Sequence, residues 1–278
     1  MKINEAYVVY FSPTHTSQRV AKAIAREVEV SEIIPVDLTL EKPDETVLPA
    51  SSLAVFAVPV YGGHVPPLAV ERLKSLRGTS TPAVVVVVYG NRAYENALVE
   101  LDKLVTSQGF KVIAGATFVG EHSYSTEAHP VAAGRPDAAD LQYAADFGEK
   151  IGEKIEKAAT SEELYGVDVR RIRRPKQPFL PLFRFLRKVI KLRKSGIPLP
   201  QAPSVEDENL CKHCGSCVRR CPTGAITAGD ELHTDASKCI KCCACVKCCP
   251  HRARVYNTPF GVLLSECFKK QKLPQSIL

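Results

Sequence analysis

Residues 6–28 read AYVVYFSPTHTSQRVAKAIAREV. This stretch predicts a buried strand over 6–11, a short hydroxyl-rich loop and a helix over 17–28. The same alternation continues to about Leu164 and is typical of a parallel sheet covered by helices on both faces. The other predicted strands are 33–37, 53–58, 83–89 and 111–119, and the other predicted helices are 67–76, 93–107 and 138–159. We therefore expect an α/β fold with a doubly wound, five-stranded parallel sheet.

The cysteines are confined to the C-terminal part of the chain. All eleven lie at or after Cys211 in a sequence of 278 residues with one Met and no Trp. A disulfide framework would spread its cysteines through the fold, so this distribution predicts a compact cysteine-built module. The length leaves room for about two domains.

The start of the chain lacks the pattern of a secretory signal. The longest unbroken apolar run, residues 83–88, is far shorter than the ~20 residues that a membrane-spanning helix needs. We therefore expect a cytoplasmic protein whose cysteines stay reduced and act as metal ligands.

Eight cysteines form two runs with the spacing C-x2-C-x2-C-x3-C-P, offset by 28 residues. The runs are Cys211, Cys214, Cys217 and Cys221 before Pro222, and Cys239, Cys242, Cys245 and Cys249 before Pro250. Three close thiolates can bind three corners of a 4Fe-4S cube, and the last cysteine of the other run binds the fourth. The expected ligand sets are Cys211, Cys214, Cys217 and Cys249 for one cluster, and Cys239, Cys242, Cys245 and Cys221 for the second.

Zinc is the alternative metal, but zinc sites use two cysteine pairs separated by a long spacer. The runs resemble bacterial-type ferredoxins with two 4Fe-4S clusters, in all eight ligands and both prolines. That resemblance implies a small α+β ferredoxin-like domain. Cys243, Cys248 and Cys267 lie outside the pattern and are expected to be small buried hydrophobic residues.

The loop after the first strand carries hydroxyl groups at the start of a helix. Its residues are Ser12, Pro13, Thr14, His15, Thr16 and Ser17. Hydroxyls and free N–H groups at a helix N-terminus can bind a phosphate, although a plain helix cap has the same composition. The chain contains neither G-x-x-x-x-G-K-[ST] nor G-x-G-x-x-G, so nucleoside triphosphates and dinucleotides lose their usual support.

The loop resembles the phosphate-binding signature of flavodoxins, with Ser12, Thr14 and Ser17 in the matching places. His15 stands where flavodoxins usually carry Gly, and we expect it to change the path of the loop. The resemblance implies that FMN binds here and that two further loops contact its ring. These loops contain Pro59, Val60, Tyr61, Gly62 and Gly63, and Tyr89, Gly90, Asn91, Arg92 and Tyr94.

Tyr61 and Tyr94 are candidates to stack on the flavin ring, with packing as the alternative role. The loops follow adjacent strands, at the edge where open α/β sheets bind ligands. A third segment, residues 120–125, either closes over this site or forms a solvated loop.

Most of the net charge of +7 comes from one basic segment. Residues 166–205 contain eleven Lys and Arg and a single acidic residue, Asp168. The rest of the chain is slightly acidic, which argues against nucleic acid as a partner. The expected division is residues 1–165 for the FMN domain, 166–204 for a basic linker, 205–256 for the ferredoxin-like domain and 257–278 for a tail.

The linker predicts one amphipathic helix over 182–194. Phe183, Leu186, Val189 and Ile190 lie on one face, and Arg184, Arg187, Lys188 and Lys191 lie on the other. We expect the apolar face to pack on one of the domains. An acidic redox partner or peripheral contact with an anionic membrane are the alternatives.

In the order of its two motifs, the chain resembles flavodoxin–ferredoxin fusion proteins of anaerobic bacteria and archaea. The resemblance implies an electron-transfer protein that passes electrons between a low-potential carrier such as ferredoxin, two 4Fe-4S clusters and FMN. The alternative is an FMN-dependent reductase of a small organic substrate, with His64, His122 or Tyr124 as proton donor. A redox sensor is weaker, because no DNA-binding motif is present. A homo-oligomer remains open.

Overall fold

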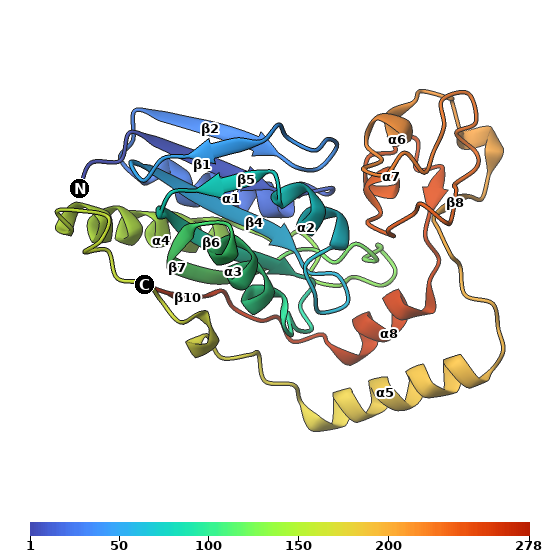
Figure 1. Cartoon of the computed structure of the whole chain (residues 1–278). Helices are drawn as coiled ribbons and strands as arrows, with labels where there is room; N and C mark the ends of the chain where they lie inside the picture. The colour runs from blue at the N-terminus through green and yellow to red at the C-terminus, as the bar shows by residue number, and fades with distance from the viewer. The chain divides into compact units, whose positions relative to one another are not determined.

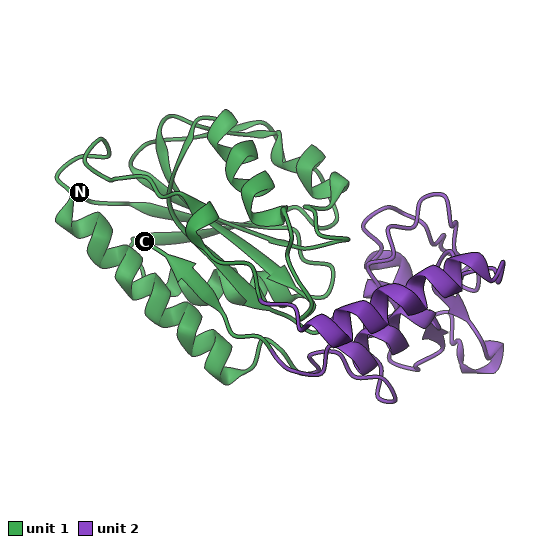
Figure 2. Cartoon of the chain, turned by 90° about the horizontal axis from the view of Figure 1, so that it is seen from below, with its two compact units in different colours: residues 1–121, 134–175, 272–278 green, residues 122–133, 176–271 purple.

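The structure is a computed structural model that describes all 278 residues. They form two compact units (Figure 2). Unit 1 consists of residues 1–121, 134–175 and 272–278, and unit 2 consists of residues 122–133 and 176–271. The chain therefore passes between the units four times. Segments 122–133 and 272–278 lie far in sequence from the bulk of the units to which they belong.

Unit 1 is built on a six-stranded sheet with the order β10-β7-β6-β4-β1-β2 (Figure 1). Five strands are parallel, and β10 runs antiparallel to β7. The strands are β1 (Glu5–Tyr10), β2 (Glu32–Asp37), β4 (Ser52–Pro59), β6 (Thr81–Tyr89), β7 (Phe110–Val119) and β10 (Gln275–Ile277). The predicted doubly wound parallel sheet is confirmed, with β10 as an addition.

Helices cover both faces of this sheet. They are α1 (Thr16–Arg26), α2 (Pro67–Leu73), α3 (Ala97–Ser107) and α4 (Ala138–Lys157), and β3 (Thr46–Leu48) pairs with β5 (Leu76–Gly78) beside them. Helices α1 and α4 pack together in one core cluster, where Ile24 and Phe147 lie among inward residues of the strands. Helix α3 packs on β6 and β7 with Leu101 and Val105 buried.

Every residue of β6, TPAVVVVVY, is buried. A continuous apolar run of this kind is stable only when both faces of the strand are covered, which is why it occupies the middle of a parallel sheet. The carboxyl ends of the parallel strands share one edge, so the loops after β1, β4 and β6 meet there.

Unit 2 holds the basic helix and the cysteine runs. Its elements are α5 (Phe179–Lys194), β8 (Ser204–Val205), the short 3-10 turn Glu208–Leu210, α6 (Ser216–Arg219), α7 (Ala244–Lys247), β9 (Arg254–Val255) and α8 (Pro259–Cys267); another 3-10 turn, Val169–Arg171, belongs to unit 1. Strands β8 and β9 are antiparallel, and α5 packs on α8 (Figure 2). None of the helices combines the length and apolar character needed to cross a membrane.

Candidate cofactor sites

The hydroxyl-rich loop joins β1 to α1. His15 is the N-cap residue of α1 and has φ 64° and ψ 0°, in the left-handed region. His15 thus adopts a backbone conformation that favours glycine, and the expected change in the path of the loop stays a prediction. Such a conformation costs a non-glycine residue about 1 kcal/mol. The His15 Nδ1 atom lies 3.1 Å from Gln18 Oε1.

Hydrogen bonds of Ser12 fix the conformation of this loop at the start of α1. The Gln18 N–H donates to Ser12 Oγ at 3.1 Å, and the Ser12 N–H donates to Thr39 Oγ1 at 2.9 Å. The N–H groups of the first helical turn, including those of Thr16 and Ser17, have no acceptor within the helix.

Ser17 shows that the loop fits a phosphate. Its side chain is fully buried, and its Oγ has no hydrogen-bond partner. A buried hydroxyl without a partner is costly, and a bound phosphate oxygen would accept its hydrogen bond. The half-buried Thr14 and Thr16 provide further hydroxyls in the same loop, and the helix dipole favours the negative charge.

The loop after β4 makes a tight turn at the same edge of the sheet. Tyr61 and His64 form an isolated antiparallel bridge, with N–H···O distances of 2.9 and 3.1 Å. Gly62 and Gly63 lie between them with φ 61° and 93°, which favours glycine. Pro59, Val60 and Tyr61 are half-buried, so Tyr61 has the partial exposure that a ring-stacking residue needs. His64 Nδ1 lies 2.5 Å from Glu100 Oε1.

In the loop after β6, the candidate residues Asn91 and Tyr94 are buried. Tyr94 is buried, packs edge-on against Tyr89 with ring centroids 5.6 Å apart, and donates from its hydroxyl to Ile172 O at 3.1 Å. This arrangement fits the packing alternative for Tyr94. Gly90 and Arg92 remain half-buried, and Arg92 pairs with Glu95 at 3.2 Å.

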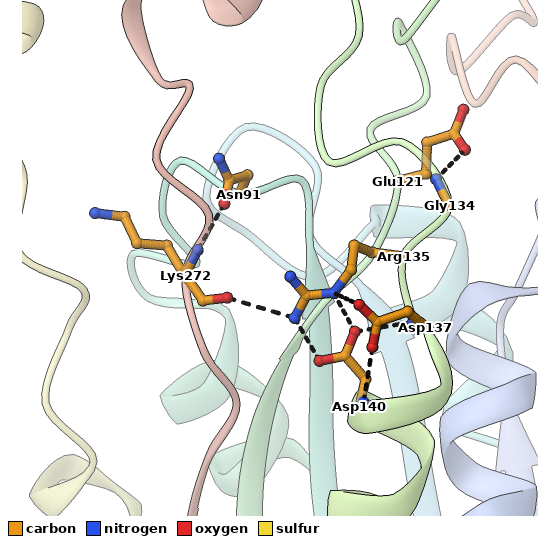
Figure 3. A network of polar contacts seen from close by, with 7 residues as sticks. All are labelled: Asn91, Glu121, Gly134, Arg135, Asp137, Asp140 and Lys272. Carbon is orange, nitrogen blue, oxygen red and sulfur yellow. Dashed lines mark hydrogen bonds and ion pairs between the residues drawn. The ribbon is translucent and has the colours of Figure 1, made fainter.

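Asn91 belongs to a polar network within unit 1 (Figure 3). Asn91 is almost fully buried with φ 62°, and its Oδ1 accepts a hydrogen bond from the N–H of Lys272. Arg135 donates to the Lys272 carbonyl at 3.4 Å and pairs with the buried carboxylate of Asp140. This network attaches the C-terminal segment to the candidate flavin loop.

The segment after β7 divides between the units. The Gly120 N–H donates to Tyr89 O at 3.0 Å, and a side chain at Gly120 would collide with Val88 Cγ1 at 2.7 Å. From His122 onward the chain belongs to unit 2. Tyr124 packs there against Tyr256 with ring centroids 5.1 Å apart.

The two cysteine runs enclose two separate cavities in unit 2. The first cavity is lined by Cys211, Cys214, Cys217 and Cys249, and the second by Cys221, Cys239, Cys242 and Cys245. Each cavity thus contains three cysteines of one run and the last cysteine of the other. No group of three or more His, Cys, Asp or Glu side chains is close enough together for a single metal ion. The thiols could hold a larger group, such as an iron–sulfur cube.

The two runs also repeat one another in backbone conformation. Positive φ angles recur 28 residues apart, at His213 and Lys241, at Gly215 and Cys243, and at Gly224 and Arg252. Gly215 and Cys243 are the N-caps of the equivalent helices α6 and α7. Cys243 therefore occupies a left-handed position that the first run fills with glycine.

The cysteines of the first set are more exposed than those of the second. Cys214 is exposed, and a hydrogen bond with Ser216 lowers its thiol pKa. In the second cavity, burial raises the pKa of Cys242 to about 12 and that of Cys245 to about 11. Iron binding must therefore displace protons from thiols that burial keeps neutral.

Backbone N–H groups point at sulfur atoms of the second cavity. The Ala225 N–H donates to Cys221 Sγ at 3.2 Å, and the Lys241 N–H donates to Cys239 Sγ at 3.4 Å. Bonds of this kind stabilise added electron density on cluster ligands and tune the reduction potential.

Arg254 is one of the basic residues of the cysteine module, and the structure gives it a place between the two cysteine sets. It is buried to 3% exposure, and its guanidinium donates to the carbonyls of Glu231 and Pro203. Its positive charge lowers the pKa of Cys217 in the first cavity and of Cys245 in the second, against the effect of burial. Its Nε has no hydrogen-bond partner. A buried cation thus influences both cavities.

The remaining three cysteines have other contacts. Cys243 Sγ donates to Lys241 O, Cys248 Sγ donates to Ser216 O, each at 3.6 Å, and Cys267 packs in an apolar cluster with Val131, Leu264 and Phe268. Cys243 also borders the second cavity.

A hydroxyl-rich loop at the edge of a parallel sheet and a cysteine-lined module are the features of an electron-transfer iron–sulfur flavoprotein. The Flavodoxin family matches residues 8–147, half of the chain, and the chain belongs to that family. A 4Fe-4S binding domain matches residues 205–227. The resemblance to flavodoxin–ferredoxin fusion proteins is therefore confirmed. The flavodoxin domain implies FMN, and the second domain implies 4Fe-4S iron–sulfur chemistry.

Individual proteins match each part of the chain. A ferredoxin of Chlorobaculum thiosulfatiphilum is 48% identical over 33 residues, which are 12% of this chain and 54% of the ferredoxin. The chain spans about half the length of the curated relatives it matches. An archaeal flavodoxin structure has 15% identity and a TM-score of 0.37, and covers 55% of this chain and 99% of its own. A Streptococcus pneumoniae flavodoxin structure has 18% identity and a TM-score of 0.38, and the match covers 54% of this chain and 99% of that flavodoxin.

Proposed function

We propose that this chain carries two 4Fe-4S clusters and one FMN, and that it passes single electrons between an acidic low-potential carrier and the flavin. The observation that supports this most strongly is the pair of separate cavities, each of which includes the four cysteines of one crossed ligand set in its lining. When bound, the clusters supply one-electron exchange and FMN supplies one- or two-electron exchange.

The protein's own residues bind and tune these groups. Ser12, Thr14, Thr16 and Ser17 would hold the FMN phosphate, with His15 keeping the loop in its left-handed turn. Tyr61 and the turn at Gly62 and Gly63 would lie along the ring. Cysteine thiolates require a reducing compartment, so we place the protein in the cytoplasm.

We infer that the first cluster is the entry point for electrons. Its ligand Cys214 is exposed, whereas the ligands Cys242 and Cys245 of the second cluster are buried. An electron from an external carrier has a shorter distance to travel to a cluster with an exposed ligand than to a buried cluster.

We infer that the second cluster is the one that exchanges electrons with the flavin. Tyr124 packs against Tyr256, and burial, Tyr256 and the nearby thiols of Cys243, Cys239 and Cys242 raise the pKa of its hydroxyl. The Lys247 Nζ fixes the same segment by donating to Ser125 O at 2.9 Å. Only four residues lie between Val119, the last residue of β7, and Tyr124. One short peptide thus links the second cluster's surroundings to the sheet edge where FMN would bind.

Charge around Cys214 indicates the kind of carrier. Lys212, Arg219 and Arg220 are exposed in the same cysteine run, and the charge of Arg219 acts on Cys214. A cationic rim of this sort speeds association with an acidic protein, and salt reduces the rate. A reduced, acidic ferredoxin has the required charge and potential.

Anaerobic stopped-flow mixing tests this function. We expect fast flavin bleaching by a reduced acidic ferredoxin and slow or absent bleaching by NADH or NADPH, because no dinucleotide-binding fingerprint is present. Lys212→Gln with Arg219→Gln should lower the association rate about tenfold at low salt. The matched control, Lys42→Gln with Arg77→Gln, alters exposed cations of unit 1. Rapid, saturable reduction by either nicotinamide, or equal loss in both double variants, would overturn the proposal.

A further inference from the structure

The expectation that the face of Phe183, Leu186 and Ile190 packs on a domain is wrong, because α5 has a second apolar face and packs with that one. Leu182 and Phe185 pack into the cluster formed with Val131, Leu264 and Phe268, and the Phe185 and Phe268 ring centroids lie 5.2 Å apart. Lys188 pairs with Glu266 of α8 on the same side. Through this face, α5 packs against α8 and the rest of unit 2.

The other apolar face is open to solvent. It consists of Phe179, Phe183, Leu186 and Ile190, which we call the outer stripe, with exposures of 77%, 57%, 49% and 54%. These positions follow the spacing i, i+4, i+7 and i+11, so they form one line along the helix. The rings of Phe179 and Phe183 are stacked, with centroids 6.3 Å apart.

The charge of α5 has one sign. The helix contains six Lys and Arg and no acidic residue. Arg184, Arg187, Lys191 and Lys194 are exposed on one side of the outer stripe, and Arg193 is exposed on the other. Apolar residues flanked by cations are the composition of helices that lie in the membrane–water interface.

We propose that the outer stripe binds the surface of a bilayer that contains anionic lipid. The acyl region would take up the two Phe rings, Leu186 and Ile190, and the lipid phosphates would neutralise the flanking cations. A second copy of the chain supplies the apolar contact but would place its own cations against these, which is unfavourable. An acidic protein offers the opposite charge but no apolar surface. A bilayer with anionic lipid offers both the opposite charge and the apolar contact. Binding to a membrane surface goes beyond the proposed electron-transfer function.

Co-sedimentation of the full-length, cofactor-loaded chain with vesicles tests the proposal. We expect binding to phosphatidylglycerol vesicles, little binding to phosphatidylcholine vesicles, and release by salt. Phe183→Ser with Ile190→Ser should weaken binding about tenfold or more. Arg187→Gln with Lys191→Gln should weaken it roughly fivefold per cation. Val47→Ser, at an exposed apolar residue of unit 1, is the control and should bind as the unaltered chain does.

Tryptophan reporters give a second readout, because the chain has no Trp of its own. Phe183→Trp places the reporter in the outer stripe, and Phe185→Trp places it two residues away on the face packed against α8. Phosphatidylglycerol vesicles should shift the emission of the first variant to the blue and leave the second unchanged. The cluster and flavin absorption should be the same in both.

Three results would overturn the proposal. The first is no binding to phosphatidylglycerol vesicles at low salt. The second is unchanged binding when Phe183 and Ile190 are replaced. The third is a concentration-dependent dimer that Phe183→Ser abolishes, since a second copy would then cover the stripe.

Discussion

The Asn91 side chain accepts a hydrogen bond of 2.9 Å from the N–H of Lys272, 181 residues further along the chain (Figure 3). Asn91 lies in the loop after β6, which is a candidate wall of the flavin site. Lys272 begins the segment that returns from unit 2 and ends in β10. The same loop is therefore a structural anchor for the C-terminus.

Replacement of Asn91 should lower the stability of unit 1. Asn91→Ala removes the hydrogen bond and strains the left-handed backbone, which together cost about 2 kcal/mol. Asn91→Gly removes only the bond and should cost about 1 kcal/mol. Urea unfolding of the FMN-loaded chain, followed by flavin fluorescence, measures both. Equal losses would show that backbone conformation is unimportant here.

The crossed ligand pattern predicts which cluster a single cysteine serves. Cys249→Ser should damage the cluster held by Cys211, Cys214 and Cys217, because its thiol borders that cavity. Cys248→Ser is the matched control and should keep both clusters. Electron paramagnetic resonance of the reduced protein distinguishes the two. Loss confined to the cluster of Cys239, Cys242 and Cys245 would refute the crossing.

The expected parts of the fold are those encoded in long local patterns. The central strands were predictable because they are continuous apolar runs, and the cysteine sets because ligand spacing is local. Strand β10 has only three residues, and its pairing with β7 depends on chain more than 150 residues away. No local pattern indicates such pairing.

Other features depended on tertiary contacts. The loop that contains His15 is bound at Ser12 to Thr39, which lies 27 residues further along the chain. The two faces of α5 arise because α8 packs on Phe185 and leaves Phe183 exposed. The sequence does not distinguish Arg254 from the other cations of the cysteine module, because only its burial shows that it acts on both cysteine sets.

Arg254 should raise the potential of the clusters, because its buried positive charge favours the added electron. Arg254→Gln should make at least one potential more negative, by on the order of 50–100 mV. Arg254→Lys keeps the charge and should recover part of the loss. Redox titration followed by electron paramagnetic resonance measures this. An unchanged potential in a fully loaded Arg254→Gln protein would contradict the role.

Lys154 should make stability depend on alkaline pH. Burial and the nearby Lys111 lower the pKa of Lys154 to about 8 from its usual 10.5, although its Nζ donates to Ile113 O at 2.7 Å and lies over the Tyr165 ring. Between pH 8 and 10.5 the unfolded chain binds more protons, so the free energy of unfolding should rise with pH.

Lys154→Met should remove that rise. Urea unfolding of both proteins across this pH range provides the comparison. Parallel pH profiles for the two proteins would mean that Lys154 does not titrate there.

Anaerobic analysis of iron, acid-labile sulfide, zinc and FMN in the purified chain tests the central claim most directly. Two cavities, each containing the four cysteines of one expected ligand set, and one hydroxyl-rich loop predict about eight irons, about eight sulfides and about one FMN per chain. Stoichiometric zinc, or half the iron with both cysteine runs intact, would contradict the account.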